Sequence, residues 1–442
     1  MGEANTVVVT RPPWWRSIGP ALITACVVFG PGSLLISSNV GARYGYELLW
    51  LLLVTGVLMG TFMTMAARVG VVGGATPCTL LAGRLGRPVA VLMGVTLCLT
   101  CAAFQFSNNL AVAAAFDSLG VKRLFGDPAE MSQATQNLVS TGLLIVFNAL
   151  VVGSIFTLRQ VYKGLERVMK IMVAVILACF LINLLVIRPD LASVLHGLIP
   201  GIPEGLSLAL PKRAATGIVD PMVLVASLLG TTFSVAGAFF QGNLVREKGW
   251  TIADYNRGIG DSIAGVTVLT SISAIIMITS GAMLRGKQAN DISVLATQLG
   301  PLLGPATRAL FSVGLFAVAM NPFVINAMIG GTILADGLGK PAKMSDAWPR
   351  RFTVVVLLIG MGVAMTVLHT SVKKVDAIIF GQALTVIGNP LMAAAILWLA
   401  NRKDVMGDRR NALVVNILGG IGFLVVLLTA ARVLYLLVLR LT

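Results

Sequence analysis

The stretch "ACVVFGPGSLLISSNVG" (residues 25–41) carries Gly-Pro-Gly at its centre and lies inside an apolar segment long enough to cross a bilayer. Proline lacks a backbone N–H and glycine is a poor helix former, so the segment predicts a membrane helix interrupted at Gly30, Pro31 and Gly32. A kink that only helps packing is the alternative interpretation. Broken backbone at membrane depth is tolerated where it lines a cavity or is buried in protein, so we expect the break to mark a binding site.

The composition around this stretch is that of an integral membrane protein. Charged residues make up 12% of the 442 and apolar residues 57%, whereas soluble domains average about 25% charged residues. We expect one polytopic, all-α membrane domain over residues 1–442. Its eleven predicted spans lie at about 18–42, 46–67, 89–116, 137–157, 166–187, 220–245, 261–284, 303–334, 351–369, 376–400 and 411–437.

The positive charge is distributed unevenly between the predicted loops. With the N-terminus inside, the inner loops carry 20 Lys and Arg and the outer loops 13, while the acids divide nine and nine. This bias predicts a cell (inner) membrane protein with a cytoplasmic N-terminus and an outer C-terminus. The net charge of +15 is then mainly topological, with some attraction to anionic lipid headgroups. We expect the lipid bilayer and a small solute or cation as partners, no nucleic acid and no obligate protein partner.

The longest connection, residues 188–219, separates five predicted spans from five more. An odd number of spans gives the two halves opposite orientations, which predicts inverted repeats at about 18–187 and 220–400 and an extra helix at about 411–437. Span six, the counterpart of span one, reads "LLGTTFSVAGAFFQGNLV" (228–245), with polar residues and Gly237 in mid-span. Interruptions at matching positions of two repeats point to a transporter's binding site.

Three stretches resemble the NRAMP family of proton-coupled divalent-metal transporters. They are "GPGSLLISSNVGARYGYELLWLLL" in the first two spans, "VYKGLERVMKIMVAVILACF" (161–180) in the fifth, and "GQALTVIGNPLMAAAILWLANRKDVMGDRRN" (381–411) in and after the tenth. The resemblance implies the leucine-transporter (APC-type) fold with broken helices one and six. In the tenth span we also expect a packing kink at Asn389-Pro390.

The family's metal-binding motifs are altered in this chain. The resemblance implies metal ligands from an Asp-Pro-Gly-Asn in span one, where this chain has Gly30-Pro31-Gly32-Ser33, and from a Met-Pro-His-Asn in span six, where it has Ser234-Val235-Ala236-Gly237. A histidine further along span six falls on Gln241. Of the family's liganding side chains, the tenth-span glutamine remains, as Gln382. The chain is thus similar to a divergent member that lacks the usual metal site.

The predicted binding residues are neutral and lie mainly on spans one, six and ten. They are Gly30, Ser33, Ser37, Thr231, Ser234, Gly237, Gln241 and Gln382. Four amides on spans three and eight are candidates for the transport path, with structural hydrogen bonds between helices as the alternative: Asn108, Asn109, Asn321 and Asn326. We predict no resident cofactor, and no carboxylate identifies a metal ligand.

Three functions fit such a site. Without a carboxylate, a divalent cation has to keep most of its water, as Mg²⁺ tends to do, so the first is transport of a largely hydrated divalent cation by alternating access. The second is transport of a small organic or anionic solute held at half-helix N-termini. The third is a sensor that no longer transports. An enzyme is not expected, because no catalytic triad, metal-ligand cluster or phosphate-binding loop is present in the sequence.

Overall fold

The computed structural model describes residues 29–156, 171, 174–175, 177–214, 217–287, 292–300, 304 and 307–441. In this part of the chain, nine helical segments are long and apolar enough to cross a membrane. They correspond to predicted spans two to four and six to eleven. The predicted first span is described from residue 29 onward, and residues 18–28 lie outside the described residues. The predicted fifth span is described mainly as the helix Leu177–Ile187.

The first half of the chain is helical. It contains α2 (Pro31–Tyr44), α3 (Leu49–Val72), α4 (Pro77–Leu85), α5 (Arg87–Ser118), η1 (Val121–Phe125) and α6 (Gln133–Phe156). The long connection that follows contains α8 (Leu191–His196), β1 (Lys212–Ala214) and β2 (Gly217–Val219). These two strands pair antiparallel, with Lys212 opposite Val219. The all-α prediction therefore misses one short hairpin of three residues on each side.

The second half begins with two short helices in line. It contains α9 (Val223–Thr232), α10 (Val235–Glu247), α11 (Ile252–Leu284), α12 (Ile292–Ala296), η2 (Thr297–Leu299), α14 (Thr307–Gly337) and α15 (Ala347–Leu368). Then follow α16 (Lys374–Leu384), α17 (Asn389–Asn401), α18 (Lys403–Met406), η4 (Gly407–Arg409) and α19 (Leu413–Leu441). The predicted tenth span is thus two helices separated by four residues, and the kink expected at Asn389-Pro390 lies at the start of the second.

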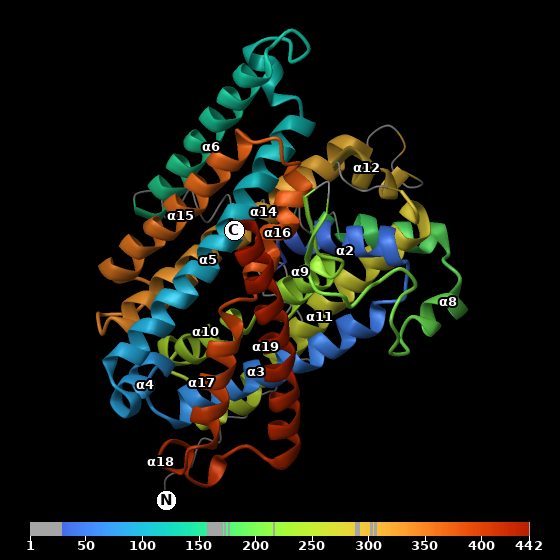
Figure 1. The fold of residues 1–442 in the computed structure, drawn as a ribbon. Coiled ribbons are helices and arrows are strands. Elements are labelled where there is room, and N and C mark those ends of the chain that lie inside the picture. The colour runs from blue at the N-terminus through green and yellow to red at the C-terminus, as the bar shows by residue number, and fades with distance from the viewer. Residues whose placement is uncertain are drawn as a thin grey trace, which may run out of the picture.

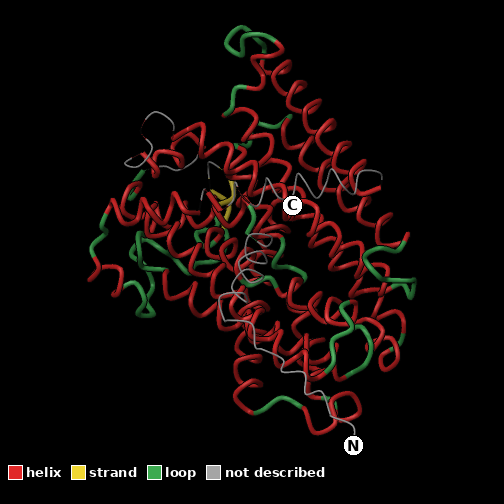
Figure 2. The backbone as a smooth tube through the Cα atoms, turned by 180° about the vertical axis from the view of Figure 1, so that it is seen from behind, coloured by secondary structure: helices red, strands yellow, loops and turns green. Residues whose placement is uncertain are grey.

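Helices α2, α9 and α16 contact one another in the middle of the molecule (Figure 1). Helices α5, α14 and α15 pack together on one side, and α3 packs against α10 and α11 on the other. The view from behind shows the small hairpin near the middle of the bundle (Figure 2). The two halves of span six and the first described helix therefore lie inside the bundle, surrounded by longer helices.

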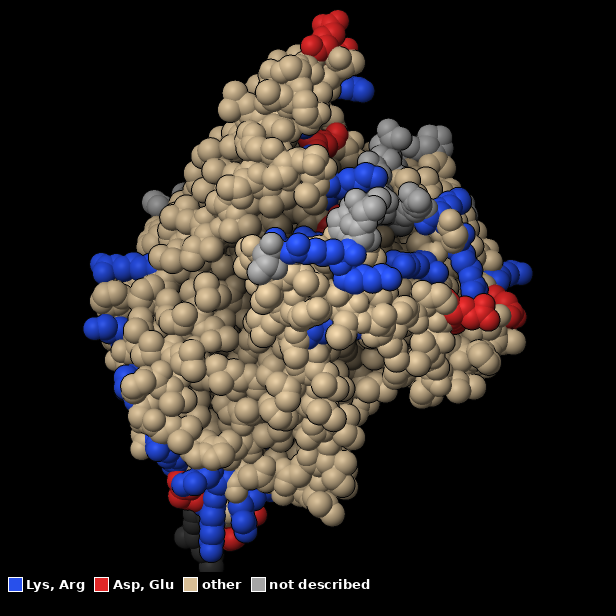
Figure 3. Space-filling view, viewed as in Figure 1, with Lys and Arg blue, Asp and Glu red and all other residues tan. Residues whose placement is uncertain are grey.

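The surface has the pattern expected of a protein surrounded by lipid. Lys and Arg gather around α18, along the left edge and in a band near α2 and α12, and the broad surface between these groups is almost uncharged (Figure 3). Helix α19 has many exposed apolar side chains, among them Leu424 and Leu428. Because exposed leucines on a long apolar helix suit hydrocarbon and not water, this surface and the nine apolar segments identify an integral membrane protein.

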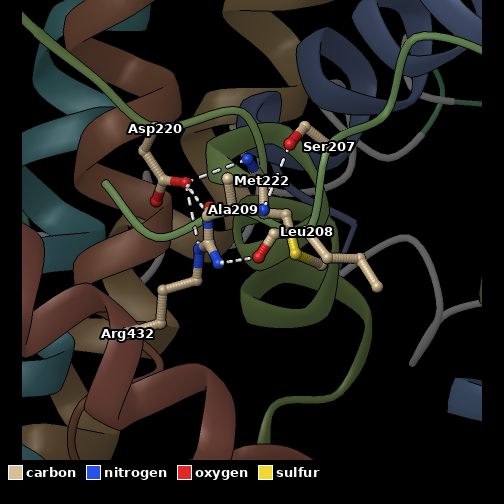
Figure 4. A network of polar contacts seen from close by, with 6 residues as sticks. All are labelled: Ser207, Leu208, Ala209, Asp220, Met222 and Arg432. Atoms are coloured by element: carbon tan, nitrogen blue, oxygen red, sulfur yellow. Dashed lines mark hydrogen bonds and ion pairs between the residues drawn. The ribbon is translucent and has the colours of Figure 1, made fainter. Parts of the chain in front are cut away.

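An arginine of α19 anchors the start of span six. Arg432 forms an ion pair with the buried Asp220, with Nη2 2.6 Å from Oδ1. It also donates hydrogen bonds to the carbonyl oxygens of Leu208 and Ala209 (Figure 4). The same Asp220 oxygen accepts the backbone N–H of Met222 at 2.9 Å. The last helix, the long connection and the beginning of α9 are thereby held together.

Candidate functional site

Helix α2 begins where the glycine-proline sequence predicts the second part of span one, and the part before residue 29 lies outside the described residues. Gly30 has extended backbone (φ −105°, ψ 171°), and α2 begins at Pro31, whose missing N–H costs nothing at the first helical position. The N–H groups of Gly32 and Ser33 fall in the first turn, where an α-helix offers them no backbone partner. A Cβ built at Gly30 would lie 3.4 Å from Cγ of Pro322 in α14. The break therefore faces the middle of span eight.

The second break lies within the stretch of span six where the sequence predicts an interruption. Helix α9 ends at Thr232, Phe233 and Ser234 are non-helical, and α10 begins at Val235. Gly237 lies in the first turn of α10. The Ser234 hydroxyl accepts a hydrogen bond from the Gly237 N–H at 3.4 Å and so acts as an N-cap. The break forms where a capping residue is available, because the cap satisfies a donor that the interruption leaves free.

An amide from span ten supports this second break. Asn389 Nδ2 donates a hydrogen bond to the Phe233 carbonyl oxygen at 3.3 Å. Asn389 is 2% exposed and directly precedes Pro390 at the start of α17. The sequence indicated a packing kink here, and nothing local in it identifies the carbonyl that the amide binds. The two interruptions, in spans six and ten, thus stabilise each other.

Gln382 lies between the two broken spans. A Cβ built at Gly32 would be 2.5 Å from its Nε2, and a Cβ built at Gly230 would be 2.4 Å from its backbone carbonyl oxygen. Only residues without a side chain allow α2 and α9 to approach α16 this closely. Gln382 is 2% exposed, and its Oε1 is buried without a hydrogen-bond partner among the described residues. An unpartnered buried acceptor is rare, and it is the feature that a ligand or an ordered water would satisfy.

The other predicted binding residues differ in whether their side chains already have hydrogen-bond partners. Ser33 and Ser37 are buried in α2, and the Ser37 hydroxyl has no partner among the described residues. The Thr231 hydroxyl donates to the Leu228 carbonyl of its own helix at 3.0 Å. Gln241 lies seven residues past Ser234, about 10 Å along the helix, and its Nε2 donates to the Ser262 hydroxyl of α11. The structure thus places Gln382 against Gly32, next to Ser33 in the first turn of α2, whereas Gln241 is bound to α11.

The candidate pathway amides also differ in whether their side chains have hydrogen-bond partners. Asn109 accepts a hydrogen bond from Asn148 of α6 at 2.7 Å, which joins two helices. Asn108 is 2% exposed and its Nδ2 has no partner in the described part of the chain. Asn326 is half-buried on α14. The Asn321 side chain lies outside the described residues.

Two serines that no sequence pattern singles out hold α16 in place. Ser107 Oγ donates to the Ile378 carbonyl oxygen at 3.3 Å, and Ser227 Oγ donates to that of Ile379 at 2.7 Å. Both are fully buried. Helix α16 is therefore bound from spans three and six just one turn before Gln382. The only sequence signal is a hydroxyl in an otherwise apolar run.

A cavity of about 560 Å³ opens at the ends of α2, α16 and α19 and the start of α9. Its lining includes three basic side chains and one acid: Arg43, Lys287, Arg440 and Asp376. The Arg440 guanidinium lies 3.9 Å from the centre of the Phe380 ring, within cation–π range. A positively charged cavity attracts anions and repels cations, and low-dielectric walls strengthen both effects.

In the described residues, no group of three or more His, Cys, Asp or Glu side chains is placed to hold a metal ion. What surrounds the breaks is neutral: serine hydroxyls, the Gln382 amide and backbone groups. Such oxygens can hydrogen-bond a hydrated ion or a polar solute. They do not supply the negative charge that offsets the dehydration of a bare divalent cation.

The sequence matches known transporters along most of its length. The family model described as natural resistance-associated macrophage protein-like matches residues 21–436. The divalent metal cation transporter MntH of Verminephrobacter eiseniae is 25% identical over 90% of this chain and 84% of its own. The MntH of Deinococcus radiodurans is 26% identical over 88% of this chain and 83% of its own.

Solved structures share the fold. The manganese transporter of Eremococcus coleocola superposes with a TM-score of 0.71 at 18% identity, covering 96% of this chain and 88% of its own. Mhp1, a nucleobase-cation-symport-1 family transporter, superposes with a TM-score of 0.54 at 13% identity, covering 95% and 92%. These likenesses confirm the predicted leucine-transporter fold. With a family match over nearly the whole sequence, the chain belongs to the Nramp family.

Proposed function

We propose that this protein is a secondary transporter that works by alternating access and carries a divalent cation in a largely hydrated, Mg²⁺-like form. The observation that carries the proposal is the buried, unpartnered Oε1 of Gln382, held where α2 and α9 meet α16. The relatives are named as divalent metal cation transporters. Because the surrounding groups are neutral, the ion's own waters have to remain as its inner ligands, with protein oxygens accepting hydrogen bonds from them.

Uptake into proteoliposomes loaded with metal-sensitive dyes tests this proposal. Mg²⁺ and Mn²⁺ are compared at equal concentration in the native protein and in the Gln382→Ala and Gln382→Glu variants. We expect saturable Mg²⁺ entry in the native protein, loss of uptake in Gln382→Ala, and a shift toward Mn²⁺ in Gln382→Glu, because a carboxylate offsets dehydration. Gln133→Ala, at the exposed start of α6, is the matched control and should transport normally. Saturable Mn²⁺ entry in the native protein would contradict the hydrated-ion proposal.

One observation favours the second candidate, a small anionic solute. The cavity lined by Arg43, Lys287 and Arg440 carries more positive than negative charge, which is unfavourable for an entering cation. If neither metal ion enters, a thermal-shift screen of small carboxylates and phosphates separates this candidate from a sensor without transport. A transported anion should stabilise the native protein and lose that effect in Arg43→Gln.

We also propose that the N-terminus is cytoplasmic and the C-terminus lies outside, in a cell (inner) membrane. The excess of Lys and Arg on the predicted inner loops supports this orientation. It places the cavity of Arg43 and Arg440 outside and the loop between α17 and α19 inside. The repeats proposed at about 18–187 and 220–400 then have opposite orientations, and the extended Gly30 before α2 and the break between α9 and α10 support this proposal.

A further inference from the structure

A second charged pocket lies at the other end of the bundle from the basic cavity. Its volume is about 250 Å³, and it is formed by the end of α3, the start of α11 and the loop before α19. Three arginines from segments far apart in the sequence line it: Arg68, Arg409 and Arg410. No acidic side chain is among its described lining residues.

Arg68 is fixed in a way that leaves part of its guanidinium free. Its Nη2 donates a hydrogen bond to Oδ1 of Asn411, directly after Arg410. Its Nε is buried and has no hydrogen-bond partner among the described residues. A buried N–H without an acceptor is costly, and a guanidinium fork is shaped to bind two oxygens of one oxyanion. The unpartnered donor therefore points to a ligand that supplies oxygens.

Two nearby acids already have partners, whereas Asp408, directly before Arg409, forms no ion pair among the described residues. Asp404 accepts hydrogen bonds from Arg84 at 2.7 Å and from Arg402 at 2.8 Å. Asp254, at the start of α11, caps its own helix through Thr251. In contrast, no ion pair to Arg409 or Arg410 is formed within the described residues. Within the described residues, the charges of Arg409 and Arg410 are therefore not neutralised by an ion pair.

The remaining wall of the pocket is mainly apolar. Val71, Val72 and Ile252 lie beside the arginines, together with Tyr255, whose hydroxyl donates to the Thr64 carbonyl oxygen. Three arginines next to apolar side chains, at the end of membrane-spanning helices, match a phosphate group attached to an apolar chain better than a freely hydrated anion. Basic pockets between membrane helices on the cytoplasmic side are suited to anionic lipid headgroups, and the proposed orientation puts this pocket on that side.

We propose that Arg68, Arg409 and Arg410 form a binding site for a phosphate group, either in the headgroup of an anionic lipid or as a free phosphate. The site is separate from the central one, so it does not depend on which solute is transported. Arg68 supplies a fixed fork, and the two exposed arginines close around the bound oxygens. Its occupation would hold the loop after α17 against α3 and α11.

Binding to the purified full chain in neutral detergent tests the site. Short-chain phosphatidylglycerol, short-chain phosphatidylcholine and inorganic phosphate are titrated in parallel at low salt. The native protein should bind phosphatidylglycerol saturably and more tightly than phosphatidylcholine. In the double variant Arg409→Ala/Arg410→Ala the affinity should fall about thirtyfold, since each arginine near an anionic lipid contributes on the order of a fivefold factor.

The matched control removes the same charge from the same side of the membrane. Lys340→Ala/Lys343→Ala alters the exposed loop after α14 and should leave the affinity unchanged. Competition by inorganic phosphate identifies a site for the phosphate group itself, and its failure to compete identifies the lipid as the ligand. Equal losses in both double variants, or no preference for phosphatidylglycerol, overturn the proposal. Melting curves of each variant confirm that the protein is folded.

Discussion

Asn389 at the start of α17 donates a hydrogen bond to the carbonyl oxygen of Phe233, at the break between α9 and α10. Two helix interruptions from segments 156 residues apart are thus joined by one side chain. A carbonyl freed in a membrane helix needs a donor, since the hydrocarbon around the protein offers none. The geometry of the break in span six therefore depends on the interruption in span ten.

Replacing Asn389 tests this dependence. Asn389→Leu removes the donor and leaves the Phe233 carbonyl buried, which should destabilise the protein by about 1–3 kcal/mol and reduce uptake. Melting in detergent and transport in proteoliposomes measure the two effects. Asn401→Leu, at the exposed end of the same helix, should change both far less. Equal effects at the two positions would show that the bond to Phe233 has no special role.

Close packing against Gln382 predicts opposite outcomes for two glycine substitutions. In Gly230→Ala the new Cβ would lie 2.4 Å from the Gln382 carbonyl oxygen, so α9 or α16 must shift, at a cost of about 1–3 kcal/mol. In Gly142→Ala, on α6, no atom lies within 4 Å of the new Cβ. That helix should gain up to about 1 kcal/mol. Melting temperatures should fall for the first variant and stay level or rise for the second.

Breaking the buried ion pair of Asp220 and Arg432 should destabilise the protein far more than breaking an exposed pair. Their side chains are 2% and 11% exposed, so Arg432→Leu leaves an uncompensated buried carboxylate and should destabilise by about 3–5 kcal/mol. Arg84→Leu, which removes a pair whose side chains are 24% and 48% exposed, should cost less than about 1 kcal/mol. The double variant Asp220→Asn/Arg432→Leu should recover part of the loss. Additive losses in that cycle would refute the coupling.

The pairing of Asp404 predicts a loss of stability in acid. Hydrogen bonds from Arg84 and Arg402 lower the pKa of the Asp404 carboxyl below its usual 3.8. The stability that these hydrogen bonds contribute is fully present at pH values above the unfolded-state pKa, about 3.9. It is lost as the pH falls through the lower folded-state pKa. Melting temperatures of the native protein and of Asp404→Asn should differ at neutral pH and converge below about pH 4. A difference that is constant with pH would contradict this linkage.

Much of the fold could be predicted from the sequence because bilayer partitioning is a local property. Apolar length alone locates nine spans that the structure describes, and Gly30-Pro31-Gly32 places the start of α2. The second break was predicted in the middle of span six without an exact residue, and it lies at Phe233–Ser234. Glycine marks a residue that weakens a helix, whereas the actual position follows from Ser234 as a cap and from the amide of Asn389, which lies elsewhere in the sequence.

The sequence by itself determined the class of protein, the neutral character of the altered site and the need for a broken first span. Hydropathy, proline and glycine affect the conformation of the chain within a few residues of themselves. These features can therefore be predicted before the tertiary structure is known. Tertiary structure alone decided that the Gln382 Oε1 is buried without a partner, that Ser234 caps α10, and that Arg68 lies beside Arg409 and Arg410. Those relationships arise when helices distant in sequence pack together, because packing selects which polar group each side chain meets.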